Sequence, residues 1–197
     1  MPRLEYWYEF ASTYSYVSTM RIGALAGAAG VEIVWRPFLL GPIFAAQGWT
    51  NSPFNLYPAK GRYMWRDMER LCADERLPLK RPAKFPQNTL LAARTALTLA
   101  QPERAAFSRA AFHAEFADGA DLADPAVVNA LIGGLGLDIP MVTARAGSPD
   151  IKAALKTQTD QAATLGIFGS PSFVAADGEL FWGNDRLEQA LQWARRG

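Results

Sequence analysis

The chain has 197 residues, of which 50% are hydrophobic and 20% are charged, a composition that is typical of a globular domain and excludes a disordered chain. Its 20 basic and 19 acidic residues almost cancel, so net charge gives no attraction to nucleic acid or to an anionic membrane. Basic residues crowd into residues 60–84, but interspersed acidic residues favour a solvated helical face over a polyanion site. The length predicts one domain, or one domain with a large insertion.

The number of cysteines and the length of the apolar runs indicate the cellular compartment of the protein. The single cysteine, Cys72, cannot form an internal disulfide, and its place in a helical pattern favours a small buried hydrophobe over a nucleophile. The first residues include Arg3, Glu5 and Glu9 and lack the apolar core of a secretion signal, and every apolar run is too short to span a membrane. We therefore expect a cytoplasmic protein with neither a membrane nor a nucleic acid as partner.

The first 36 residues predict a strand, a helix and a second strand. Residues 4–10 alternate with aromatic side chains and are typical of a strand. Ser12 or Thr13 can cap a helix that runs to about residue 29 and is ended by Gly30. Residues 32–36 form the second strand, and the short spacing indicates a parallel βαβ unit.

The middle of the chain is predicted to be helical and the end to be a hairpin with a helix. Residues 39–61 are expected to form a loop, rich in aromatics, and every strong signal in residues 60–149 is helical. Helices are expected at about 61–75, 88–100 and 102–116, with two more in 123–138 and 148–166. Pro171 precedes a short strand, Asp177-Gly178 makes the turn, residues 179–182 form the partner strand, and Asn184 caps the last helix.

This order of elements predicts an α/β, thioredoxin-like fold, βαβ…ββα, with an all-helical insertion. The thioredoxin-like domain would comprise residues 1–59 and 166–197, and the insertion residues 60–165. A plain α+β domain is the alternative, but it leaves the motifs of the candidate site unexplained.

The first candidate site is the start of the helix at Ser12. Thioredoxin-type redox proteins carry Cys-x-x-Cys at this corner, whereas this chain has Ser12 and Ser15. Unpaired backbone N–H groups, the helix dipole and a hydroxyl donor together could stabilise the thiolate of a bound molecule. Ser12 lacks an evident base, because the only histidine, His113, lies in the helical block. The alternative is that Ser12 only caps the helix.

Two further motifs are candidates for binding. In "FGSPSF", a turn at Ser170-Pro171, with a cis or a trans peptide bond, would leave the Ser170 backbone N–H and C=O free to pair with an extended peptide. The alternative is an ordinary turn before an edge strand. In "WGNDR", Asp185 could bind the ammonium group of a ligand beside the predicted cap Asn184, and the alternative is capping alone.

Five segments, "EFASTYSY", "WRPFLLGPIF", "TNSPFNLYPAKGRY", "GIFGSPSFV" and "FWGNDRLE", together resemble the 2-hydroxychromene-2-carboxylate isomerases. These are relatives of the kappa-class glutathione transferases in the DsbA-like branch of the thioredoxin fold. The resemblance follows the same order along nearly the whole chain. It implies glutathione as cofactor, a small aromatic carboxylate as substrate and a homodimer.

The resemblance also implies roles for particular residues. Ser12 would hold the glutathione sulfur as a thiolate. The remaining glutathione contacts would be Asn51 and Lys60 in the long loop, Ser170 before Pro171 for the cysteinyl unit, and the pair Asn184 and Asp185 for the γ-glutamyl end. Two positions depart from the family pattern, since Glu9 stands where Asp is common and Thr13 where Pro is common.

The implied reaction is the isomerisation of a 2-hydroxychromene-2-carboxylate to trans-o-hydroxybenzylidenepyruvate in the breakdown of naphthalene-like aromatics. The thiolate would add to the conjugated double bond, allow rotation and leave, so that glutathione is regenerated. A flat apolar pocket could be lined by aromatic residues, which could equally be core: Tyr14, Phe38, Phe44, Trp49, Phe54 and Tyr57.

Two alternative functions stay open. A transferase or peroxidase of kappa type would consume glutathione with an electrophile, and a non-catalytic module would bind a peptide or protein partner through the proline loop and the helical block. A dithiol oxidoreductase is nearly excluded, because Ser12 and Ser15 stand where sulfur would be needed. His, Cys and carboxylate residues show no metal-ligand spacing, so a metal site is not expected.

Overall fold

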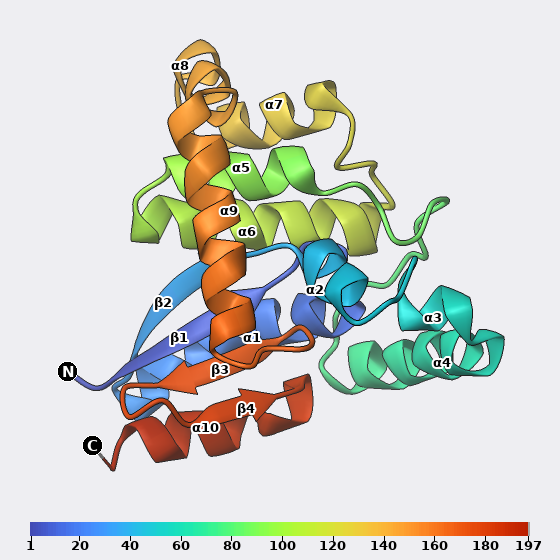
Figure 1. Ribbon diagram of the computed structural model, residues 1–197, viewed down its shortest axis with the longest axis vertical. Helices are drawn as coiled ribbons and strands as arrows, with labels where there is room; N and C mark the ends of the chain where they lie inside the picture. Colours follow the sequence, from blue (N-terminus) through green and yellow to red (C-terminus); the bar gives the residue numbers. More distant parts are fainter. Residues whose placement is uncertain (197) are drawn as a thin grey trace.

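The computed structural model describes residues 1–196 and contains a four-stranded sheet with helices packed on both faces (Figure 1). The strands are β1 (Arg3–Tyr8), β2 (Glu32–Pro37), β3 (Ser172–Ala175) and β4 (Leu180–Trp182), in the spatial order β2-β1-β3-β4. β1 pairs in parallel with β2 and antiparallel with β3, and β3 pairs antiparallel with β4. The predicted βαβ…ββα framework is therefore confirmed.

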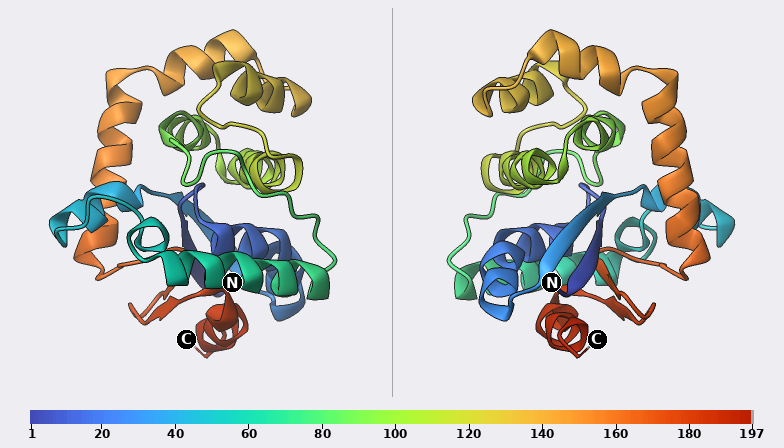
Figure 2. Two further views of the ribbon diagram at one scale, coloured as in Figure 1. Left: turned by 90° about the vertical axis from the view of Figure 1, so that its right-hand side faces the viewer. Right: turned by 90° about the vertical axis from the view of Figure 1, so that its left-hand side faces the viewer.

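The helices cover both faces of this sheet and the open edge of β2 (Figure 1). They are α1 (Thr13–Ala29), α2 (Leu40–Ala46), α3 (Pro53–Leu56), α4 (Pro58–Asp74), α5 (Leu90–Thr98), α6 (Gln101–His113), α7 (Pro125–Gly134), α8 (Ile139–Ala146), α9 (Pro149–Thr164) and α10 (Leu187–Ala194), with a π-helical turn at Ala114–Asp118 and a 3-10 turn at Asn184–Arg186. The two side views show α5 and α6 above the sheet, α7 and α8 above them, and α9 descending from α8 to the sheet (Figure 2). The helical insertion is thus confirmed, whereas its exact boundaries remain a prediction.

Alternation along β1 divides the core between the two faces of the sheet. Tyr6 is fully buried, lies opposite Trp35 on β2 and Phe173 on β3, and has its ring centroid 5.2 and 5.4 Å from theirs. Trp7 points to the other face and packs with Phe38 in a smaller buried cluster. Because side chains alternate along a strand and aromatic pairs add to simple area burial, β1 anchors both halves of the core.

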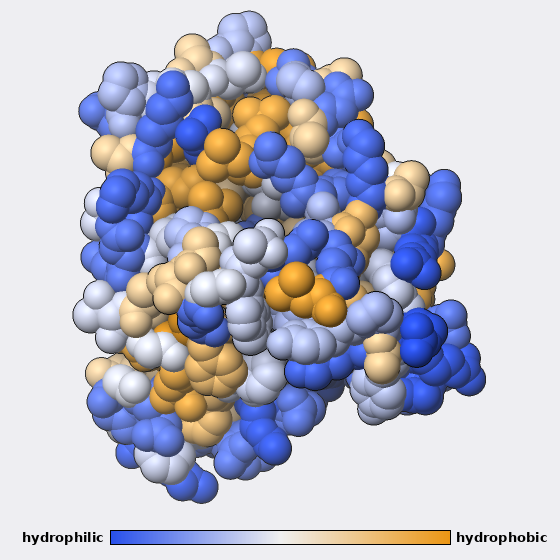
Figure 3. All heavy atoms as spheres, turned by 45° about the vertical axis from the view of Figure 1, so that its right-hand side comes forward, coloured by the Kyte–Doolittle hydropathy of each residue, from blue (hydrophilic) through white to orange (hydrophobic). Residues whose placement is uncertain are grey.

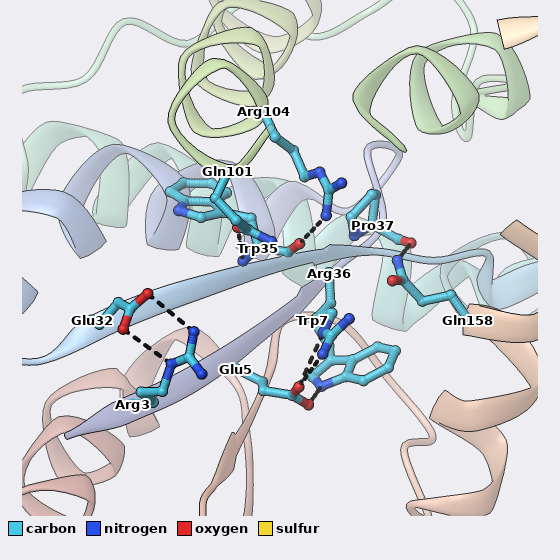
Figure 4. Close-up of polar contacts among 10 residues, drawn as sticks. All are labelled: Arg3, Glu5, Trp7, Glu32, Trp35, Arg36, Pro37, Gln101, Arg104 and Gln158. Atoms are coloured by element: carbon cyan, nitrogen blue, oxygen red, sulfur yellow. Dashed lines mark hydrogen bonds and ion pairs between the residues drawn. The ribbon is translucent and has the colours of Figure 1, made fainter. Parts of the chain in front are cut away.

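Side chains from the insertion cover the open edge of β2 (Figure 4). The Trp35 N–H donates to Gln101 Oε1 at 2.8 Å, and the Trp35 carbonyl accepts from Arg104 Nη1 at 3.0 Å. Gln158 on α9 donates to the Pro37 carbonyl. These bonds satisfy the outward backbone groups of an edge strand, which would otherwise be open to pairing with another chain. They also attach the helical layers to the sheet.

Three helices were not predicted. α2 and α3 lie within residues 39–61, which were expected to be a loop, and α8 lies between the last two expected helices of the block. Pro53 and Pro140 occupy the first turns of α3 and α8, where a missing N–H costs nothing. Short helices of this kind depend on packing rather than on a long periodic pattern, so their proline residues suggest a loop when the sequence is taken alone.

The surface in Figure 3 is a mixture of hydrophilic and apolar residues, with apolar side chains gathered mainly at the height of α5 and α7. Across residues 1–196, we find no helix with the length and apolar character that crossing a bilayer would require.

Replacing Arg104 with methionine is expected to lower the free energy of unfolding by about 2–4 kcal/mol, because the carbonyls of Trp35, Ala96 and Leu99 each lose a hydrogen bond from the guanidinium group. Arg109 lies on the same helix, is exposed, and stacks over the Trp35 ring at 5.8 Å. Arg109→Met is therefore the control, with an expected loss below about 1 kcal/mol. Urea unfolding followed by circular dichroism measures both, and equal losses would contradict the role given to the Arg104 hydrogen bonds.

Candidate functional site

Ser12 is the N-terminal cap of α1, as predicted. Its backbone is extended, with φ −87° and ψ 116°, and its Oγ accepts a hydrogen bond from the Ser15 N–H at 3.2 Å. The Ser12 carbonyl accepts the next helical bond, from the Tyr16 N–H at 3.2 Å. The first N–H groups of a helix have no partner within it, so this corner favours a negatively charged ligand atom.

The loop before β3 is hydrogen-bonded directly to this corner. Ser12 Oγ donates to the Ser170 carbonyl oxygen at 2.9 Å. The Ser170 hydroxyl oxygen accepts from the Glu9 N–H at 2.8 Å and lies 2.7 Å from Ser15 Oγ. We call these four residues, Glu9, Ser12, Ser15 and Ser170, the Ser170 junction. The Ser170–Pro171 peptide bond is cis, one of the two forms expected.

The Ser170 junction corrects the prediction for the Ser170 carbonyl and adds Ser15 to the residues of the candidate site. The Ser170 carbonyl was expected to be free for an extended peptide, but it accepts the Ser12 hydroxyl proton because the helix start and the loop lie side by side. Ser15 was seen only as a place where sulfur is missing. Its hydroxyl holds the Ser170 side chain, a role that depends on a contact across 155 sequence positions.

The Glu9 carboxylate is buried and faces protein groups. Its two oxygens accept from the Leu40 N–H at 3.0 Å, from the Ala11 N–H at 3.4 Å and from the Thr89 hydroxyl. Burial raises the pKa of Glu9, and these hydrogen bonds oppose that rise. The longer Glu side chain thereby connects the site to the starts of α2 and α5.

Glu115, which the sequence did not single out, is a second buried acid. It lies in the π-helical turn that follows α6, is 0% exposed, and neither of its carboxyl oxygens has a hydrogen-bond partner within residues 1–196. Burial raises the pKa of Glu115 well above its ordinary value, and the charges of Glu9 and Asp121 raise it further. A π turn of this kind often marks a functional region.

The structure places Asn184 differently from the prediction. It was expected to cap the last helix, but it opens a 3-10 turn and its Oδ1 accepts from Ser18 Oγ at 2.9 Å and from Arg21 at 3.3 Å. The cap prediction is wrong because α1 supplies these better-placed donors. Asp185 projects outward, with 76% of its side chain exposed and Arg186 at 3.8 Å.

The predicted ligand residues of the long loop stay apart from the junction. Asn51 Oδ1 accepts from the Ser52 N–H at 2.7 Å and from Asn55 at 3.2 Å, while Lys60 Nζ lies 5.0 Å from the Tyr57 ring centroid. Within residues 1–196, no hydrogen bond or ion pair joins Asn51 or Lys60 to Ser12 or Ser170. Their role as ligand contacts therefore remains a prediction.

The six aromatic residues fall into different environments. Phe38 is fully buried in the core and cannot line an open pocket. Tyr14 lies near Phe54, at 6.4 Å between ring centroids, and donates its hydroxyl proton to Asp67 at 2.9 Å. The other members are Phe44, which is 5.3 Å from Trp49, and the half-exposed Tyr57.

Cys72 is buried, as predicted, and burial raises the pKa of its thiol to about 11. A thiol with this pKa is a poor nucleophile at neutral pH. In the part of the chain that the structure describes, His, Cys, Asp and Glu side chains do not assemble in groups of three or more that could hold a metal ion.

Residues 3–193 match the family described as the DSBA-like thioredoxin domain. The chain belongs to this family. It is 28% identical to a 2-hydroxychromene-2-carboxylate isomerase from Sphingobium xenophagum over 94% of both chains, and 28% identical to human glutathione S-transferase kappa 1 over 95% of this chain and 89% of the relative. A solved 2-hydroxychromene-2-carboxylate isomerase structure superposes with a TM-score of 0.87, at 25% identity, over 98% of this chain and 95% of that one.

In this DSBA-like chain, the two buried acids are expected to respond differently to neutralisation, because Glu9 has hydrogen bonds to lose and Glu115 has none within residues 1–196. Glu9→Gln replaces an acceptor oxygen with an NH2 group facing other donors, so the free energy of unfolding should fall by about 1–3 kcal/mol. Glu115→Gln has no such bond to lose. Since the folded-state pKa of Glu115 is raised, its stabilising contribution is complete below the unfolded pKa and is lost as pH rises through the folded pKa.

Glu115→Gln should therefore gain stability relative to the wild type as pH rises from 4 to 8. Urea unfolding at several pH values measures this difference for each variant. If the difference does not change with pH, the pKa of Glu115 is the same in the folded and unfolded states, which contradicts this prediction.

Proposed function

We propose that the chain is a glutathione-dependent isomerase that converts 2-hydroxychromene-2-carboxylate-type compounds to trans-o-hydroxybenzylidenepyruvate. The observation that carries the proposal is the position of the Ser12 hydroxyl, which caps α1 and lies 2.9 Å from the Ser170 carbonyl before a cis proline. Similarity to isomerases along 94% of the chain supports the same activity. Such a reaction belongs to the breakdown of aromatic compounds in the cytoplasm.

The chemistry of the donor set fits glutathione. The tripeptide has two carboxylates and one ammonium group, and the outward Asp185 carboxylate could take the ammonium. The Asn184 oxygen is already engaged, so its amide group would donate to the γ-glutamyl carboxylate. Lys60 and Asn51 would contact the other carboxylate, and the Ser170 backbone, beside Pro171, would pair with the cysteinyl unit.

Ser12 would act as a hydrogen-bond donor and not as a nucleophile. When bound, glutathione supplies a thiolate that can add to a conjugated double bond and leave again. The α1 N-terminus and the Ser12 hydroxyl would favour this charged form, and together they could lower the thiol pKa by about one to three units. Partly exposed aromatic residues such as Tyr14 and Phe54 would contact the aromatic carboxylate substrate.

A second candidate is a transferase or peroxidase of kappa type. The 28% identity to the human kappa transferase favours it, and the same Ser12 arrangement would serve it. The two activities differ in stoichiometry, because an isomerase leaves total glutathione unchanged and a transferase consumes it. Counting glutathione before and after turnover of a hydroxychromene carboxylate therefore separates them. Because the resemblance to the isomerase family implies a homodimer, we also propose that this chain forms one.

Ser12→Ala should abolish most of the thiolate stabilisation. In the wild type, the ultraviolet thiolate absorbance of bound glutathione should titrate about one to three units below the free thiol, and in the variant the pKa should return toward its solution value. Ser148→Ala is the matched control, because Ser148 caps α9 in the same way but lies on another helix. Absence of glutathione binding at millimolar concentration would rule out both enzyme proposals and favour a non-catalytic binding module.

A further inference from the structure

The Ser12 hydroxyl already donates a hydrogen bond within the protein. Its acceptor is the Ser170 carbonyl oxygen at 2.9 Å, and a carbonyl can only accept, so the direction of this bond is fixed. The Ser12 oxygen meanwhile accepts from the Ser15 N–H at 3.2 Å. In this arrangement Ser12 has no second proton to offer to a sulfur atom.

The acceptor is held more firmly than the donor. Ser170 is fixed through its own hydroxyl oxygen by the Glu9 N–H and by Ser15, and the following Pro171 carbonyl accepts from the Gly183 N–H at 3.0 Å. Moving the Ser170 carbonyl would break several of these bonds. The Ser12 hydroxyl, in contrast, can turn to another acceptor by rotation about its side-chain bonds.

We propose that the Ser12 hydroxyl is released by a ligand amide N–H that replaces it on the Ser170 carbonyl, so that the site stabilises the thiolates of peptide-like thiols better than those of simple thiols. This inference rests on the proposed function and names the ligand class more narrowly. An extended ligand that pairs with the loop before β3 places an N–H on this carbonyl. Ser12 then donates to the charged sulfur, a stronger acceptor than a neutral carbonyl.

The ligand N–H replaces Ser12 on the Ser170 carbonyl, and the ligand sulfur replaces the carbonyl as acceptor for Ser12. Each of these two exchanges makes the other more favourable. A simple thiol without an amide would accept the hydrogen bond from the Ser12 hydroxyl and leave the Ser170 carbonyl without a donor. This costs the free energy of an unmade hydrogen bond. A peptide without sulfur would have to compete with Ser12 for the carbonyl. A cysteinyl unit within a peptide carries its thiol on Cβ and an amide N–H on the neighbouring Cα, so it can make both exchanges. Cysteinyl peptides are therefore favoured over small thiols.

The experiment compares two tripeptides with two forms of the protein by calorimetry. The ligands are glutathione and γ-glutamyl-alanyl-glycine, which has the same backbone and no sulfur. Removing the Ser12 hydroxyl frees the Ser170 carbonyl, so Ser12→Ala should bind the sulfur-free tripeptide about three- to tenfold more tightly than the wild type. Ser12→Gly, which keeps an acceptable helix cap, should show the same gain.

The outcomes separate this inference from the proposed function. A gain for the sulfur-free tripeptide, together with loss of the thiol pKa shift for glutathione, supports both. Glutathione binding with a lowered thiol pKa, but an unchanged affinity of both Ser12 variants for the sulfur-free tripeptide, overturns the release mechanism and leaves the isomerase proposal intact. No binding of glutathione to the wild type overturns both.

Discussion

Ser170 joins segments that are far apart in the sequence, and the geometry of the site depends on this attachment. Its hydroxyl oxygen accepts from the Glu9 N–H just after β1, and its carbonyl accepts from the Ser12 hydroxyl at the start of α1. The sheet brings β1 and β3 together, but only these side-chain bonds fix the loop against the helix. The cap, the loop and the buried acid behind them are therefore one unit, and a change in any member alters the position of the others.

The junction explains what hydroxyls can do where related thioredoxin-fold proteins use sulfur. A serine hydroxyl does not ionise near neutral pH, so Ser12 and Ser15 can orient and donate hydrogen bonds but cannot form a disulfide. Ser15 accordingly holds the loop, while the Ser12 hydroxyl is the donor that a ligand would redirect in the proposed exchange. The chain has a single thiol of its own, Cys72, which is buried and has a raised pKa. Sulfur chemistry at this site requires a thiol from the ligand.

What could be predicted from the sequence was local. The cap at Ser12 follows from its immediate neighbours, and the strand and helix order follows from periodicity. Asn184 was misassigned because its partner Ser18 is 166 positions away, and no local pattern reports such a contact. The start of α2 was missed for the same reason, since the Leu40 N–H is bound by the side chain of Glu9. The resemblance to a family supplied candidate ligand residues, but not their contacts.

The two buried acids bear on the charge that the site can accept. A helix N-terminus stabilises an anion only if nearby negative charge does not cancel its field. The hydrogen bonds to Glu9 come from Leu40, Ala11 and Thr89, which spread any charge that it carries. Glu115 lacks such donors within residues 1–196, and its burial raises its pKa, so it keeps its proton over a wider pH range. The burial that makes Glu115 costly to ionise thus also keeps a second negative charge away from Glu9.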